Sequence, residues 1–123
     1  MTLDCEVVLT SSGALAMRDR LSGEVMHPVV GPRLEAERLY LGPSRLAARL
    51  NEPGPAPLLL LDVGLGAGSN AIAAWALSEQ RSLAARTLSI VSFDRSTHAL
   101  ELAAAPEHRA AFGLEGGAGR AVR

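Results

Sequence analysis

A run of four leucines, followed by an aspartate and a glycine-rich turn, constrains this sequence more than any other feature. Residues 58–63 read Leu-Leu-Leu-Leu-Asp-Val, between a proline-rich stretch and the glycines at 64, 66 and 68. The run has no alternation of apolar and polar residues, which is typical of strands buried on both faces of a parallel sheet. We therefore expect a strand that is buried on both faces at residues 58–63.

The residues that follow predict a strand–helix–strand unit. Residues 70–81 are expected to form a helix with Ser69 as its N-cap. Residues 87–93 are rich in β-branched side chains and predict a second strand, which Asp94 ends. Because parallel strands are joined by a right-handed crossover, the chain is expected to have an α/β fold, with a further helix at 96–102.

The rest of the chain divides by composition into three segments. In residues 1–32, short apolar stretches alternate with turn clusters, which predicts a small antiparallel β-meander. Residues 33–57 predict a helical segment and a proline-rich connector, and Gly42-Pro43 is expected to break the helical segment in two. Residues 58–113 form the partial α/β unit, and the glycine-rich tail at 114–123 is expected to be flexible.

Composition excludes several classes of function. The 12 basic and 13 acidic residues give a net charge of −1, whereas a free-standing nucleic-acid binder would be strongly basic. The single cysteine, Cys5, excludes a disulfide framework, and the three scattered histidines make a metal site improbable. The acidic start does not resemble an export signal, and Asp62 interrupts the longest apolar stretch, so we expect a cytoplasmic protein outside the membrane.

The glycine turn is the one feature that indicates chemistry. It follows the carboxyl end of a parallel strand, which is where ligands bind in open α/β sheets. Gly64, Gly66 and Gly68 allow a sharp turn and the close approach of a ligand to the main chain. A carboxylate at the end of the second strand, Asp94, can accept hydrogen bonds from both hydroxyls of a ribose.

The spacing of the glycines favours S-adenosylmethionine over a nicotinamide dinucleotide. The dinucleotide fingerprint has glycine at its first, third and sixth places, and here the sixth place is Ser69. Asp62 can contact the ammonium of an amino-acid moiety but would repel a diphosphate. A purely structural role stays open for each of these residues. The glycines could form only a tight turn between strand and helix, and Asp62 could be an ordinary carboxylate at the end of a strand. Asp94 could stabilise the positive end of the dipole of the following helix without any ligand.

The sequence from Leu59 to Asn70 resembles motif I of class I methyltransferases. It is most similar to the MnmC-like family, the methyltransferase half of a bifunctional enzyme that modifies the wobble uridine of tRNA. That family has an acid-x-Gly-Phe/Leu-Gly-x-Gly-x-Asn pattern at this place, which Asp62 and Asn70 match. Asp94-Arg95 resembles the end of the family's second strand, and the likeness extends over about residues 6–102.

The resemblance implies the N-terminal part of a Rossmann-like methyltransferase fold with S-adenosylmethionine as cofactor. It further implies that the chain methylates the exocyclic amine of 5-aminomethyl-2-thiouridine in tRNA. The residues implied to bind the cofactor are Asp62, Gly64, Gly66, Gly68, Asn70 and Asp94.

The sequence departs from the family in what it lacks. The family's sheet has seven strands, and its acidic segment for the acceptor amine has no counterpart after Asp94, so no catalytic residue is assigned. The sequence reads as a truncated member of the family. The alternative is a non-catalytic fragment or interaction module that keeps only the nucleoside-binding half of the site. Its open sheet edges are expected to promote self-association.

Overall fold

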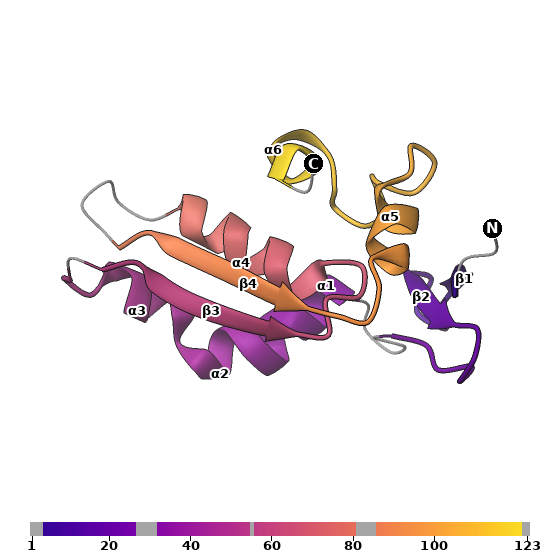
Figure 1. The fold of residues 1–123 in the computed structure, drawn as a ribbon, viewed down its shortest axis with the longest axis horizontal. Helices are drawn as coiled ribbons and strands as arrows, with labels where there is room; N and C mark the ends of the chain where they lie inside the picture. The colour runs from indigo at the N-terminus through magenta and orange to yellow at the C-terminus, as the bar shows by residue number, and fades with distance from the viewer. Residues whose placement is uncertain (1–3, 27–31, 55, 81–85, 122–123) are drawn as a thin grey trace.

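The computed structural model describes residues 4–26, 32–54, 56–80 and 86–121, which form a mixed α/β fold (Figure 1). Two two-stranded sheets are present in this part of the chain, one antiparallel and one parallel. The strands are β1 (Cys5–Leu9), β2 (Leu15–Asp19), β3 (Leu58–Val63) and β4 (Leu88–Phe93). The helices are α1 (Pro32–Ala36), the π-helix η1 (Glu37–Leu41), α2 (Gly42–Ser44), α3 (Leu46–Asn51), α4 (Ser69–Glu79), α5 (His98–Ala104) and α6 (Gly116–Ala121).

The predicted strand–helix–strand unit is confirmed. Strands β3 and β4 pair in parallel, with Leu58 opposite Leu88 and Val63 opposite Phe93. Helix α4 connects them, and it begins directly after the glycine turn. Residues 81–85, on which the predicted end of this helix falls, lie outside the described residues. The parallel register brings the carboxyl ends of both strands to one edge, beside the start of α4.

Helices cover one face of the β3–β4 sheet and leave the other bare, as Figure 1 shows. Leu46 and Leu50 of α3 and Ala74 of α4 form a buried cluster against the sheet, together with Leu58, Leu60, Leu88 and Ile90. On the opposite face Leu61 is 61% exposed and Val63 is 82% exposed. The expectation of burial on both faces is therefore wrong for the described structure, in which helices cover a single face.

The helical segment breaks later than its sequence predicts. Helices α1, η1 and α2 follow one another without interruption, and Gly42 has right-handed helical torsions. Pro43 lies in the first turn of α2, directly after the π-helix, and the chain stays helical through it. The break is instead at Arg45, whose φ of 55° is left-handed, and α3 begins after it.

The N-terminal segment is a hairpin with one added bridge. Strands β1 and β2 pair antiparallel from Cys5–Asp19 to Leu9–Leu15, and Arg18 forms an isolated bridge with Val25. This is the small antiparallel arrangement that the turn clusters predict. Met17 is 1% exposed and packs with α5 residues Ala99 and Ala103 in a second hydrophobic cluster. The hairpin therefore lies at the carboxyl end of the sheet. The residues expected to end the meander, 27–31, lie outside the described residues.

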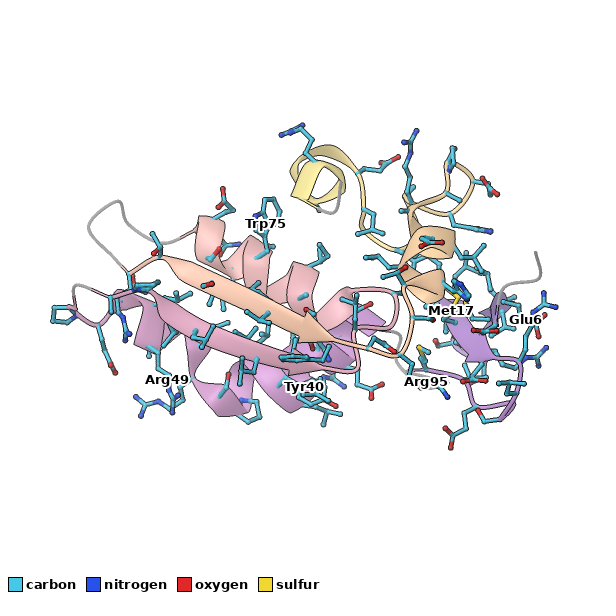
Figure 2. All side chains as sticks on the ribbon, in the orientation of Figure 1. Glu6, Met17, Tyr40, Arg49, Trp75 and Arg95 are labelled. Carbon is cyan, nitrogen blue, oxygen red and sulfur yellow. The ribbon has the colours of Figure 1, made fainter. Side chains whose placement is uncertain are left out.

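The C-terminal residues are more ordered than their composition predicts. Residues 116–121 form α6, and Leu114 is 2% exposed within the cluster that contains Met17. Ala118 is also buried, and α6 lies against Trp75, which projects from α4 toward it in Figure 2. The expectation of a flexible tail at 114–123 is wrong for residues 114–121, because Leu114 and Ala118 bury apolar surface against the body.

No helix in the described ranges is long and apolar enough to cross a membrane.

Candidate functional site

The glycine loop joins the carboxyl end of β3 to the start of α4. All three glycines have positive φ angles, of 85° at Gly64, 53° at Gly66 and 82° at Gly68. These left-handed torsions strain residues that carry a Cβ atom, so the turn requires glycine at these positions. The N–H of Gly64 donates to the carbonyl of Phe93 at 2.8 Å, which extends the strand pairing into the loop.

The three glycines meet different surroundings. A Cβ atom built on Gly66 would lie 3.2 Å from the sulfur of Met26, and one on Gly68 would lie 3.1 Å from Cδ1 of Leu100. A Cβ on Gly64 would meet nothing within 4 Å among the described residues. Side chains of the protein therefore approach Gly66 and Gly68 closely, whereas the side of Gly64 is open to a ligand.

The start of α4 differs from its predicted form in one respect. The N-cap is Gly68, and Ser69 is the first residue of the helix and makes no side-chain cap. The N–H groups of the first turn therefore have no side-chain acceptor at the cap position, which is an arrangement that favours anions and polar ligands. Asn70 follows, and its buried Oδ1 has no hydrogen-bond partner among the described residues.

Asp94 is hydrogen-bonded to the glycine loop. Its Oδ2 accepts from the N–H of Gly66 at 2.9 Å, and its Oδ1 accepts from the N–H of Arg95 at 2.6 Å. The hydrogen bond from Gly66 holds the pKa of the Asp94 carboxyl below its ordinary value, with smaller contributions from the N–H groups of Arg95 and Ser96. The carboxylate is thus ionised at neutral pH and fixed beside the loop.

Asp62 lies on the face of the sheet that the helices cover. It is 7% exposed, and its Oδ2 accepts a hydrogen bond from the hydroxyl of Ser92 at 2.9 Å. Ser92 is the register partner of Asp62 on β4. The two aspartates that the sequence singles out are therefore held differently, one by a neighbouring strand and one by the glycine loop.

The hairpin contributes residues that sequence reasoning missed. Oδ2 of Asp19 lies 3.1 Å from Nη2 of Arg95, and Oδ2 of Asp4 lies 3.1 Å from Nδ1 of His98. Figure 2 shows Arg95 between the carboxyl end of the sheet and the hairpin. These pairs join residues 76 and 94 positions apart, and no local pattern in the sequence signals them.

Two hollows lie near the start of α4. A cavity of about 180 Å³ lies beside the glycine loop, and its lining includes Gly66, Asp94, Arg95, Asp19 and Met26. A larger cavity of about 860 Å³ lies between α4 and the C-terminal residues, and its lining includes Trp75 and Phe112 but neither Gly66 nor Asp94. The smaller cavity is the one that contains residues the sequence predicts to bind a ligand.

Comparison with known proteins gives one match. No protein-family model matches the sequence, and no curated protein matches it. Among solved structures, the chain is similar to the crystal structure of MnmC2 from Aquifex aeolicus, with a TM-score of 0.59 and 22% sequence identity. The match covers 77% of this chain and 31% of that chain. The likeness supports a Rossmann-like fold of the MnmC type, and this chain spans about a third of the length of the structure it matches.

Proposed function

We propose that this chain carries the nucleoside-binding half of an S-adenosylmethionine-dependent methyltransferase site. The observation that supports this most is the hydrogen bond between Asp94 and Gly66, because it fixes an ionised carboxylate beside a glycine loop. Both lie at the carboxyl end of a parallel strand pair, where α/β proteins bind ligands. The shared fold with MnmC2 agrees with this assignment.

The carboxylate of Asp94 keeps acceptor positions that a ribose could use. An ionised carboxylate offers about four acceptor positions. The backbone N–H groups of Gly66 and Arg95 donate to Oδ2 and Oδ1 of Asp94. The remaining positions would accept hydrogen bonds from the hydroxyls of the ribose.

The amino-acid end of the donor would lie along Gly64 and the start of α4. The side of Gly64 is open, and the first turn of α4 presents N–H groups that the cap leaves without a side-chain acceptor. Asn70 would serve this end of the site, because its buried Oδ1 lacks a donor among the described residues. Asp62 is buried on the covered face and bonded to Ser92, so it would support the end of β3, from which the loop begins.

When bound, the donor supplies an electrophilic methyl group on a sulfonium. This chain's residues would bind and orient it, and orientation accounts for much of the rate enhancement in such transfers. We infer that the acceptor is the exocyclic amine of 5-aminomethyl-2-thiouridine in tRNA, from the resemblance of residues 59–70 to the MnmC-like family. A tRNA acceptor would place the protein in the cytoplasm.

The second candidate function is a non-catalytic interaction module. The bare face of β3–β4 favours it, since Leu59, Leu61 and Phe93 are each more than half exposed. A parallel sheet is ordinarily covered on both faces. A chain with this face open would bind a partner or a second copy of itself, whether or not it binds a nucleoside.

Calorimetric titration with S-adenosylhomocysteine tests the donor site. The folded chain should bind with a dissociation constant in the micromolar range, and Asp94→Asn should weaken binding by about tenfold, roughly 1.4 kcal/mol. Asp19→Asn is not a suitable control, because Asp19 lines the same cavity. Glu6→Gln is suitable, because Glu6 pairs with Arg18 on the hairpin and is absent from the cavity lining.

Transfer is tested separately with a radiolabelled methyl donor and tRNA bearing 5-aminomethyl-2-thiouridine. Label in the tRNA supports the methyltransferase. Donor binding without transfer supports the module that keeps only half of the site. A folded sample that gives no heat with S-adenosylhomocysteine overturns the donor site altogether.

A further inference from the structure

We propose that a hollow at the amino end of β3 is a second binding site, which takes the phosphate group of a small phosphomonoester. The hollow has a volume of about 350 Å³, and it is lined by Arg45, Arg49, Glu52, Leu58 and Arg86. Pockets for small ligands begin at about 300 Å³. None of the residues proposed for the methyl donor lines this hollow, so the inference is independent of the donor site.

The hollow lies at the end of the sheet opposite to the glycine loop. Leu58 is the first residue of β3, and the loop follows Val63 at the other end of the strand. With a rise of about 3.3 Å per residue, the strand separates the two places by roughly 17 Å. Figure 2 shows Arg49 on α3, at the end of the sheet that is away from Arg95. A ligand in the hollow would therefore be bound apart from the methyl donor.

Three guanidinium groups surround the hollow without an acidic partner. Within the described ranges, Arg45, Arg49 and Arg86 take part in no ion pair. Glu52 is the one acidic residue in the described lining, which leaves an excess of two positive charges. The chain as a whole has a net charge of −1. A local excess of positive charge in a hollow attracts an anion.

Two hydrogen bonds fix Arg86 in place. Its backbone N–H donates to the carbonyl of Leu50 at 3.1 Å, and its Nε donates to the carbonyl of Ala56 at 3.1 Å. Its stem runs past Gly54, where a Cβ atom would lie 3.5 Å from Cδ of Arg86. The two terminal nitrogens remain as donors for an oxyanion. Because the side chain is already held, little conformational freedom is lost when an anion binds.

Arg45 has a backbone conformation that favours glycine. Its φ is 55°, and in the part of the chain that the structure describes no other non-glycine residue has a positive φ. Strained conformations of this kind gather at functional sites. The carbonyl of Arg45 accepts from the N–H of Arg49 at 3.0 Å, which sets the two arginines one helical turn apart. Since glycine would suit the turn better, we attribute the arginine at this position to its side chain.

A phosphomonoester fits these groups better than other common anions. The planar guanidinium fork matches phosphate oxygens and binds them in pairs. A phosphomonoester carries a charge of about −1.5 to −2 at neutral pH, which balances the excess in the hollow, whereas a phosphodiester or a carboxylate carries one charge. Glu52 only accepts hydrogen bonds when ionised, so it would accept from a hydroxyl beside the phosphate. The ligand class is therefore a phosphorylated polyol or sugar.

Calorimetric titration of the whole chain with three probes tests this inference. The probes are glycerol 3-phosphate, methyl phosphate and dimethyl phosphate. Glycerol 3-phosphate should bind with a dissociation constant of about 0.1–1 mM. Methyl phosphate, which has no hydroxyl for Glu52, should bind about threefold more weakly. Dimethyl phosphate, which has a single charge, should bind about tenfold more weakly than methyl phosphate.

Substitutions in the lining should change these affinities in different directions. Arg49→Gln and Arg86→Gln should each weaken both phosphomonoesters by about tenfold. Glu52→Gln should strengthen methyl phosphate by about threefold, because it removes a repulsion, and should narrow the preference for glycerol 3-phosphate. Arg109→Gln is the matched control, because it removes the same charge from an exposed position outside the hollow. It should change neither affinity.

Arg45→Gly separates binding from folding. Glycine adopts left-handed torsions without strain, so a thermal melt should show a melting temperature equal to that of the wild type or higher. The same variant should bind glycerol 3-phosphate about tenfold more weakly, because one guanidinium is lost. A variant that is at least as stable and binds as tightly as the wild type would mean that Arg45 takes no part in the site.

The outcomes decide between this site and its alternatives. A folded wild type that binds neither phosphomonoester overturns the proposal. Equal weakening by Arg109→Gln and Arg49→Gln also overturns it, because the attraction would then be that of the whole surface. If dimethyl phosphate binds as tightly as methyl phosphate, the assignment to phosphomonoesters is wrong and a phosphodiester is the ligand. Loss of S-adenosylhomocysteine binding with phosphate binding intact would affect the donor site alone.

Discussion

Oδ2 of Asp94 lies 2.9 Å from the backbone nitrogen of Gly66, so the end of the second parallel strand is hydrogen-bonded to the middle of the glycine loop. The two residues are 28 positions apart in the sequence. This contact arranges the candidate site before any ligand binds. The contact also contributes to the stability of the fold, because the ionised carboxylate of Asp94 accepts from the N–H groups of Gly66 and Arg95.

Asp94→Asn should change how stability depends on pH. The pKa of Asp94 is lowered in the folded chain, chiefly by the N–H of Gly66. Its contribution to stability is therefore complete above the unfolded pKa of about 3.9, and it is lost as the pH falls through the lower folded value. We expect the variant to melt at a lower temperature than the wild type at neutral pH, and the difference to shrink below about pH 4.

Thermal melts of both proteins between about pH 7 and pH 3 provide the measurement. Asp19, whose pKa is also lowered, is present in both proteins, so its contribution cancels in the difference. A difference in melting temperature that stays constant over this range would contradict the assignment.

Gly68→Ala should destabilise the chain more than Gly64→Ala. Both glycines have φ angles above 80°, where an alanine costs about 1–2 kcal/mol. Only Gly68 is also approached by a side chain, that of Leu100 at 3.1 Å, whereas Gly64 faces open space among the described residues. Urea denaturation should show a further loss of about 1 kcal/mol for Gly68→Ala. Equal losses would mean that Leu100 moves aside at no cost.

Ser92→Ala should weaken the fold by leaving Asp62 without its hydroxyl donor. Asp62 is 7% exposed, and the hydroxyl of Ser92 lies 2.9 Å from its Oδ2. Loss of one partner of a buried polar group costs about 1–3 kcal/mol. Ser89→Ala is the matched control, because Ser89 lies on β4 and is exposed on the bare face. Comparable free energies of unfolding for the two variants would exclude a supporting role for the Ser92–Asp62 hydrogen bond.

Leu61→Lys should reduce self-association. We propose that copies of this chain associate through the bare face of β3–β4, on which Leu61 is 61% exposed. A lysine there adds a charge that must be desolvated when two such faces meet. Light scattering should show mass that rises with concentration for the wild type and less so for the variant. Leu21→Lys is the control, because Leu21 is 83% exposed on the hairpin and away from this face. If both variants associate as the wild type does, the bare face is not the contact.

Local features of the sequence determined the elements of the α/β unit. The short apolar run at 58–63, bounded by prolines and glycines, and the β-branched residues at 87–93 favour extended strands, and they form β3 and β4. The glycines between them adopt left-handed torsions that other residues avoid, which locates the turn and the start of α4. These properties act over a few residues, and for that reason a single sequence is enough to show them.

Tertiary contacts decided what the sequence could not show. Gly42-Pro43 does not break the helical segment, and the break lies at Arg45, where the backbone turns left-handed. Leu114 and Ala118 order the C-terminal residues by burial against distant partners. The pairing of Asp19 with Arg95 depends on how the hairpin meets the sheet. Composition and periodicity do not encode such long-range contacts, since they arise only once separate elements pack together.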